Sequence, residues 1–281
     1  MSRKSVAGLV TLLSCLDGIP AMFAMSKPPL AVKTRIHSWI RYFFFSFATL
    51  STLWMINNVR TRDVDDSMFQ SSTSIALTDT PASLELRPLL AQPKRGLIFF
   101  CGSGIAADAY IPLLRPVAEA GFTVFIIKLP WRFAPLESHK EIVLSQAKDI
   151  ISSHPGLPSW VIAGHSLGAA LSARYVQTDT DHIAGMLLLG STHPKSADLS
   201  GLRIPVTKVF ATNDQVAPRE KIIANKNLLP RQTRWVEIDG GNHSQFAHYR
   251  YQLLDGDATI PREQQQAQAR EEILAMLKQV D

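Results

Sequence analysis

The sequence contains very little cysteine. Its 281 residues include two cysteines, Cys15 and Cys101. Cys15 lies in the N-terminal tail and Cys101 in a predicted core strand, so we expect no disulfide between them. No group of cysteines and histidines has the spacing of a metal site. The residues therefore indicate neither a disulfide-framed fold nor a metal centre.

Acidic residues are nearly absent from the first part of the chain. Residues 1–62 contain eight lysines or arginines and a single acidic residue, Asp17, whereas the remainder contains 21 basic and 23 acidic residues. The isoelectric point near 9.3 therefore reflects this N-terminal part and not the rest of the chain. Because these basic residues flank apolar runs, they favour a membrane over nucleic acid as a partner.

Charge is missing altogether between Arg41 and Arg60, and we predict a transmembrane anchor over residues 36–59. Residues 42–56 are mostly apolar, and at about 1.5 Å per residue they span roughly 22 Å of the roughly 30 Å hydrocarbon layer. The preceding residues extend the helix if Arg41 reaches the membrane surface. A signal peptide and a buried helix remain alternatives. The positive-inside rule predicts that the part of the chain after the anchor lies on the extracytoplasmic side.

The predicted anchor separates a basic and apolar tail, residues 1–35, from a polar tether, residues 60–74. The tail contains an apolar run, Val6–Leu16, that resembles the core of a signal peptide and that could also be a second membrane segment. A translation start at Met22 or Met25 is an alternative to Met1.

From residue 75 short apolar strands alternate with helices, and we predict one folded domain over residues 75–281. The predicted strands are Ile75–Leu77, Ser83–Leu86, Gly96–Cys101, Gly121–Ile127, Trp160–Ala163, Ile183–Leu189, Val206–Ala211 and Arg234–Ile238. The predicted helices are Asp108–Ala120, Glu137–Ser152, Ala169–Val176, Arg219–Leu229 and about Pro261–Val280. This alternation predicts an α/β fold with a mostly parallel sheet covered by helices on both faces.

Residues 164–168 read Gly-His-Ser-Leu-Gly and lie between a predicted strand and a predicted helix. Gly-x-Ser-x-Gly in this setting is typical of a nucleophile elbow, a tight turn that presents Ser166 above the sheet. The two glycines let the strand and the helix approach closely. Ser166 is therefore the candidate nucleophile, at a helix N-terminus that favours developing negative charge.

A serine nucleophile needs a base and a group that orients the base. Asp214 and His243 follow later predicted strands, at the edge of a parallel sheet where such side chains converge, and we assign them as acid and base. The alternative acids are Asp198 and Asp239, and the alternative bases are His165, His193 and His248.

An oxyanion hole requires two backbone amides near the nucleophile. We predict the amides of Leu167, which follows the nucleophile, and Ser103, in the loop after the strand Gly96–Cys101. An ordinary strand-to-helix turn is the alternative for residues 102–104.

Several stretches form a set that is found together in one family. They are Gly96–Gly104 with Asp108-Ala109-Tyr110, the elbow at residues 164–168, Ala211–Asp214, and Gly240–Phe246 with Asp255–Ile260. Together they resemble the α/β-hydrolase superfamily, in particular its small lidless fold-5 group, over residues 75–281. The resemblance implies a serine hydrolase, and its members often carry an N-terminal membrane segment. The oxyanion loop of the group resembles Pro-Gly-Gly, whereas this chain has Cys101-Gly102-Ser103.

A helical cap domain is missing from the predicted pattern, because only residues 190–204 separate two consecutive strands. We therefore expect the acyl site to be shallow.

Taken together, these features predict a membrane-anchored serine hydrolase that cleaves an ester or related acyl bond through an acyl-enzyme on Ser166. This chemistry needs no cofactor. An acyltransferase with the same residues and a catalytically silent membrane-tethered binding module are the alternatives.

Overall fold

A computed structural model describes residues 30–93, 95–195 and 197–279. The predictions for Val6–Leu16, Met22 and Met25 lie outside the described residues. The chain divides into two units between Leu53 and Trp54, and each unit is described by itself.

Helix α1 (Leu30–Asn58) begins the described part of the chain, and its aromatic side chains are exposed. The predicted helix is therefore present. Within the described ranges, however, no helix is both long and apolar enough to cross a membrane, so the transmembrane span predicted over residues 36–59 is not confirmed. Hydroxyl side chains such as Ser46, Thr49 and Ser51 interrupt the run of aromatic and aliphatic residues.

The second unit is built on an eight-stranded sheet with the order β1-β2-β4-β3-β5-β6-β7-β8. The first two strands form an antiparallel hairpin whose second strand is antiparallel to β4, and all the other neighbours are parallel. The strands are β1 (Ile75–Asp79), β2 (Ser83–Pro88), β3 (Arg95–Phe100), β4 (Thr123–Ile127), β5 (Ser159–His165), β6 (Ile183–Leu189), β7 (Val206–Ala211) and β8 (Arg234–Ile238).

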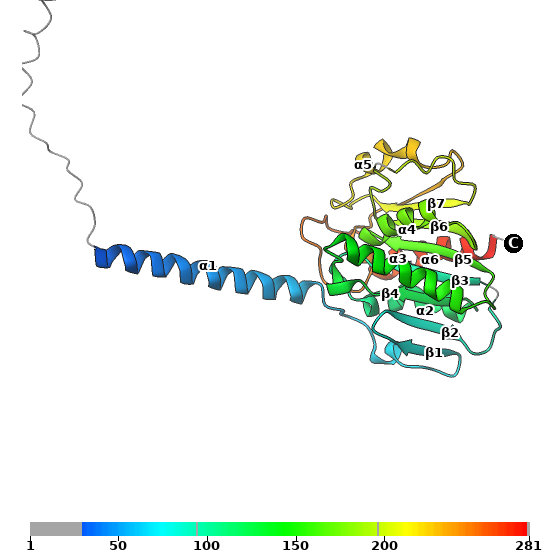
Figure 1. Cartoon of the computed structure of the whole chain (residues 1–281), viewed down its shortest axis with the longest axis horizontal. Coiled ribbons are helices and arrows are strands. Elements are labelled where there is room, and N and C mark those ends of the chain that lie inside the picture. The colour runs from blue at the N-terminus through cyan, green and yellow to red at the C-terminus, as the bar shows by residue number, and fades with distance from the viewer. Residues whose placement is uncertain (1–29, 94, 196, 280–281) are drawn as a thin grey trace, which may run out of the picture. The chain divides into compact units, whose positions relative to one another are not determined.

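Helices cover both faces of this sheet (Figure 1). Helices α3 and α4 pack together on one face, and α2 and α6 pack together on the other. The α-helices of this unit are α2 (Ile111–Glu119), α3 (Glu137–Ser153), α4 (Leu167–Thr178), α5 (Arg219–Ala224) and α6 (Arg262–Gln279). Short 3₁₀ turns occur at η1 (Asp66–Phe69), η2 (Ala107–Tyr110), η3 (Pro130–Arg132), η4 (Lys226–Leu228) and η5 (Ser244–Phe246).

The predicted elements of the domain are present, most of them with ends within two residues of the prediction, and two helices differ further. The helix predicted over Asp108–Ala120 begins as the 3₁₀ turn η2 and becomes α-helical only at Ile111. Pro112, whose ring fixes φ and which has no N–H to donate, suits this first turn. The helix predicted over Arg219–Leu229 divides into α5 and η4.

Residues 60–74, predicted as a tether, lie against the domain in this structure. The guanidinium of Arg115 donates to the carbonyls of Met68 and Gln70, at 2.8 Å each. The Thr61 hydroxyl donates to the Asp108 carboxylate at 2.6 Å. The segment is therefore held by hydrogen bonds to the helix α2 region.

The parallel strands end together along one edge of the sheet, and the loops at this edge carry the candidate site. Strand β5 lies between β3 and β6, and its side chains from Trp160 to His165 are buried. The connection between β6 and β7 contains no helix in its described residues, 190–195 and 197–205. This connection runs as a loop where a cap domain would be inserted.

Candidate active site

Ser166 is the single residue between β5 and α4, and its backbone has φ 55° and ψ −114°. A non-glycine residue with positive φ is strained, and such residues cluster at functional sites. A Cβ at Gly164 would collide with the backbone of Gly168, and a Cβ at Gly168 would collide with the carbonyl of Phe100. The two glycines therefore allow the tight turn that the motif predicts.

Asp214 and His243 form a buried pair at the ends of β7 and β8. His243 Nδ1 lies 2.8 Å from Asp214 Oδ2, and the two side chains are 2% and 0% exposed. The other carboxylate oxygen of Asp214 accepts the backbone N–H groups of Val216 and Ala217, at 2.9 and 2.6 Å. The carboxylate is thus fixed by backbone amides and orients the imidazole, which is the arrangement of a general base.

The alternative acids contact other groups. Asp239 is exposed and accepts a hydrogen bond from the Thr212 hydroxyl, at 3.3 Å. Asp198 is exposed and accepts the backbone N–H of Ser200, at 2.9 Å. Of the acids weighed from the sequence, the structure therefore places Asp214 against His243.

Two of the alternative bases, His193 and His248, lie in surroundings that differ from those of His243. Burial, with the neighbouring Lys195 and Lys208, lowers the pKa of His193 to about 4. His248 Nδ1 lies 3.2 Å from the carbonyl of Asp63, in the segment that precedes β1. Neither has a carboxylate partner among the described residues.

His165 has no carboxylate partner in the described chain either, but it connects the elbow to the base. Its ring packs on the ring of His243, with centroids 4.6 Å apart, and it directly precedes Ser166 in the chain. The structure thus brings the acid and base together beside the elbow. In the described structure, the Ser166 hydroxyl makes no hydrogen bond to the side chain of His243. Such bonds often tighten only when substrate is bound.

The loop that carries His243 is fastened by a second buried carboxylate, Asp255. It accepts the backbone N–H groups of His243 and Ser244, at 3.2 and 2.8 Å, and the Ser244 hydroxyl at 2.7 Å. Gln265 of α6 adds two hydrogen bonds to the backbone of Asn242. Side chains outside the acid–base pair therefore set the position of the imidazole.

The two amides predicted for an oxyanion hole are free in the described structure. Leu167 is the first residue of α4, where an N–H has no acceptor within its own helix. In the loop after β3, the N–H groups of Gly102 and Gly104 are hydrogen-bonded, to the Tyr110 hydroxyl at 2.8 Å and to the Arg132 carbonyl at 2.7 Å. The N–H of Ser103, between them, makes no hydrogen bond among the described residues.

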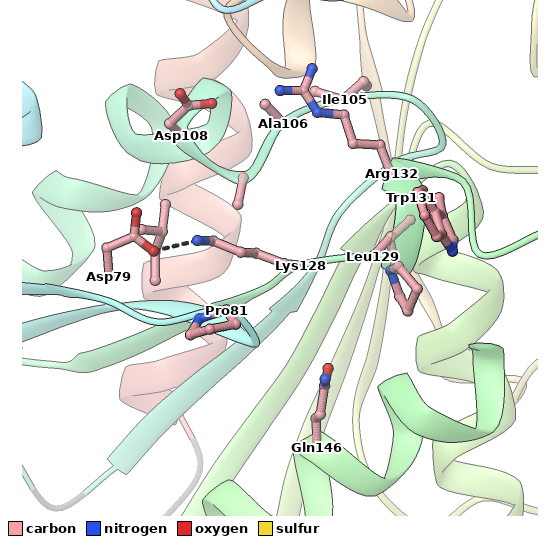
Figure 2. Close-up of a pocket in the computed structure, with 13 residues that line it drawn as sticks. Asp79, Pro81, Ile105, Ala106, Asp108, Lys128, Leu129, Trp131, Arg132 and Gln146 are labelled. Carbon is pink, nitrogen blue, oxygen red and sulfur yellow. Dashed lines mark hydrogen bonds and ion pairs between the residues drawn. The ribbon is translucent and has the colours of Figure 1, made fainter.

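Two cavities lie at this edge of the sheet, each of about 420 Å³. One borders the elbow and is lined by Leu167, Ala170, Leu171 and the loop His193–Lys195. The other is lined by residues that follow β3 and β4 and contains the ion pair between Lys128 and Asp79 (Figure 2).

The described residues contain no group of three or more histidine, cysteine, aspartate or glutamate side chains that could hold a metal ion. Cys101, the described cysteine, is buried, and burial raises the pKa of its thiol well above the usual value. A thiol in that state is a poor nucleophile.

A strained serine between a strand and a helix, beside a buried acid–imidazole pair on later loops, is an arrangement typical of α/β hydrolases. The chain belongs to the alpha/beta hydrolase family, whose model matches residues 96–267. The resemblance inferred from the sequence is confirmed. No curated protein matches the chain in sequence.

Solved structures share the fold at low sequence identity. A ferulic acid esterase from Streptomyces cinnamoneus is 16% identical with a TM-score of 0.57, and the match covers 69% of each chain. A predicted CIB-like hydrolase from Thermoplasma acidophilum is 13% identical with a TM-score of 0.56, over 71% of this chain and 99% of that one. A thermophilic esterase from Thermogutta terrifontis is 14% identical with a TM-score of 0.54, over 73% and 97%.

Reasoning from the sequence gave no role to Asp255, Gln265 or Tyr110. Asp255 and Tyr110 lie in stretches that carry the family resemblance, which was the available signal. Their hydrogen bonds join segments that are separated in the sequence and meet only in the fold, so the residue pattern alone could not assign them.

Proposed function

We propose that this protein is a serine hydrolase that cleaves an ester bond through an acyl-enzyme on Ser166. The observation that carries the proposal is the buried hydrogen bond between His243 and Asp214 beside the strained elbow serine. The family supplies the hydrolase class, and esterases occur among the structural neighbours.

In this mechanism the hydroxyl of Ser166 attacks the ester carbonyl carbon while the imidazole of His243 accepts its proton. Asp214 holds the imidazole with Nδ1–H toward the carboxylate and stabilises the imidazolium. The amides of Leu167 and Ser103 donate to the oxyanion of the tetrahedral intermediate. The carbon–oxygen bond to the leaving alcohol then breaks, and the alcohol takes the proton from His243. Water repeats the sequence on the acyl-enzyme and releases the acid.

Hydrolysis of p-nitrophenyl acetate by the full chain tests the proposal. Ser166→Ala should abolish turnover, whereas Ser172→Ala, which removes a nearby serine hydroxyl within α4, should keep near-normal activity. If the wild-type chain folds but hydrolyses no ester in a broad panel, the catalytically silent alternative replaces this proposal.

The cavity beside the elbow supports a small acyl group. Its lining comes from α4, the loop after β6 and Lys140 of α3, and the described residues between β6 and β7 contain no cap helix to sheathe a long chain. Each methylene contributes about 0.8 kcal/mol only where it is covered. We therefore expect kcat/KM on p-nitrophenyl esters to peak at acyl chains of about two to six carbons. A maximum at long chains with activation by an interface would contradict this.

We also propose that helix α1 attaches the protein to a lipid bilayer. Exposed aromatic residues such as Trp39 and Phe43 suit the membrane interface, and Arg35 and Arg41 suit anionic headgroups. The full chain should float with phosphatidylglycerol vesicles, and replacing Phe43, Phe44 and Phe47 with serine should abolish flotation.

Replacing the exposed Leu89 and Leu90 of the second unit with serine is the matched control and should leave flotation unchanged. Equal flotation of the triple variant and the wild type would contradict the membrane proposal. The extracytoplasmic location of the hydrolase domain remains a prediction. Protease added outside intact cells should then degrade the domain, and full protection would contradict it.

A further inference from the structure

Tyr110 lies at the centre of a buried network that joins the predicted oxyanion loop to the base. Its side chain is fully buried at the end of η2. Its hydroxyl accepts the N–H of Gly102 at 2.8 Å and lies 2.9 Å from Nδ1 of His165. One hydroxyl thus contacts the loop before Ser103 and the residue before Ser166.

The direction of these hydrogen bonds follows from the donors available. The Tyr110 oxygen accepts a hydrogen bond from the Gly102 amide, so its own O–H donates to Nδ1 of His165, the other partner in the structure. Burial raises the pKa of Tyr110 well above its usual value, so the phenol keeps its proton. Burial, with the neighbouring His243, lowers the pKa of His165 well below its usual value, so its ring is neutral and can accept.

The network reaches two parts of the proposed active site, the oxyanion loop and the base His243. On one side, the amides of Gly102 and Gly104 are fastened, which leaves the intervening amide of Ser103 free to donate. On the other side, the ring of His165 packs on the face of His243. A Cβ at Gly102 would lie 2.9 Å from the Tyr110 oxygen and 3.0 Å from His165 Nδ1, so the glycine allows this close approach.

We propose that Tyr110 is a positioning residue of the active site, whose hydroxyl fixes the Ser103 amide toward the oxyanion and holds His165 against the base. The inference rests on the proposed serine-hydrolase function. Preorganised donors stabilise the transition state without reorganising during the reaction. Loss of the hydroxyl therefore affects the chemical step more than the binding of substrate.

The first experiment compares Tyr110→Phe with the wild-type chain on p-nitrophenyl acetate. Removal of a whole oxyanion donor costs about 10²–10³ in kcat, so loosening one should lower kcat by about 10- to 100-fold while KM changes by less than about 2-fold. Tyr175→Phe is the matched control, because this buried tyrosine of α4 has a hydroxyl without a hydrogen bond in the described structure. It should keep near-normal kcat.

A second set of variants separates positioning from general loss of stability. His165→Asn keeps an acceptor for the Tyr110 hydroxyl, whereas His165→Leu removes it. We expect His165→Leu to lower kcat as much as Tyr110→Phe does. His165→Asn should recover at least about half of this loss in log kcat. The double variant Tyr110→Phe/His165→Leu should have a kcat no lower than that of either single variant. Thermal unfolding of each variant is measured in parallel.

The outcomes distinguish the inference from the function on which it rests. If the wild-type chain hydrolyses esters through Ser166 but Tyr110→Phe retains its kcat, the inference is wrong and the function stands. The inference is also wrong if the loss of kcat across the variants correlates only with their melting temperatures and His165→Asn recovers no activity. If Ser166→Ala is as active as the wild type, the proposed function fails and the inference falls with it.

Discussion

The two sides of the candidate site are held in place by different kinds of groups. On the base side, around β7 and β8, the carboxylates of Asp214 and Asp255 hold the imidazole and its loop, and both residues are less than 10% exposed. On the oxyanion side, after β3, the groups are neutral, namely the Tyr110 phenol, the His165 imidazole and backbone carbonyls. Changes of charge should therefore act mainly on the base side, whereas the oxyanion side should respond to loss of a single hydroxyl.

The largest expected effect comes from the acid. Asp214→Asn keeps the shape of the side chain but favours the wrong imidazole tautomer, so kcat should fall by about 10³–10⁴. Steady-state kinetics on p-nitrophenyl acetate measure the loss. Asp239→Asn is the control and should be nearly neutral. If Asp239→Asn loses activity while Asp214→Asn retains it, the assignment of the acid is wrong.

A smaller effect is expected from the carboxylate behind the base. Asp255→Asn weakens the bonds to the amides of His243 and Ser244, and displacing the imidazole by a fraction of an ångström should lower kcat by about 10- to 100-fold. Asp257→Asn, an exposed carboxylate two residues away, should change kcat little. Equal activities of the two variants would show that Asp255 does not set the position of the base.

The smallest effect on catalysis, and a distinct one on stability, is expected at Lys208. Its ammonium is buried in β7 and donates to the carbonyl of His193, and burial lowers its pKa to about 7. In the unfolded chain the pKa of a lysine is near 10.4. Between about pH 7 and about pH 10.4 the unfolded chain therefore binds more protons at Lys208 than the folded chain does. As a result, the stability of the wild type rises as the pH increases from about 7 to about 10.4.

Lys208→Met removes this dependence. At pH 6 the variant should be more stable than the wild type, by on the order of 1–4 kcal/mol, and the difference should shrink as the pH rises through that window. Denaturant unfolding at several pH values measures it. The exposed Lys221→Met is the control, and a difference independent of pH would contradict the lowered pKa.

The sequence predicted the strands of the sheet in more detail than the contacts within the candidate site. Apolar strands such as Ile183–Leu189 were located to the residue, because a buried parallel strand is recorded in local hydrophobicity. The elbow and the loop positions of Asp214 and His243 followed from a motif and the chain order. The sequence also assigned Asp214 as the acid, with Asp239 as an alternative at the end of the neighbouring strand, and the structure adds the 2.8 Å contact of Asp214 with His243.

Other features were beyond a sequence-based prediction for physical reasons. The roles of Tyr110 and Asp255 depend on contacts between loops, and no local pattern encodes them. Residues 36–58 do form a helix, yet whether an aromatic helix with interspersed hydroxyl residues spans a bilayer depends on total apolarity and not on the absence of charge. The segment after it contacts the domain through Arg115, a partner distant in sequence.

Covalent labelling of the full chain with a fluorophosphonate, followed by mass spectrometry of the proteolysed adduct, tests the central claim most directly. The account predicts one adduct, on the hydroxyl of Ser166, that is lost in Ser166→Ala and slowed in Asp214→Asn. Ser172→Ala should label like the wild type. An adduct on another residue, or none on a folded chain that hydrolyses esters, would contradict the assignment of Ser166 as the nucleophile.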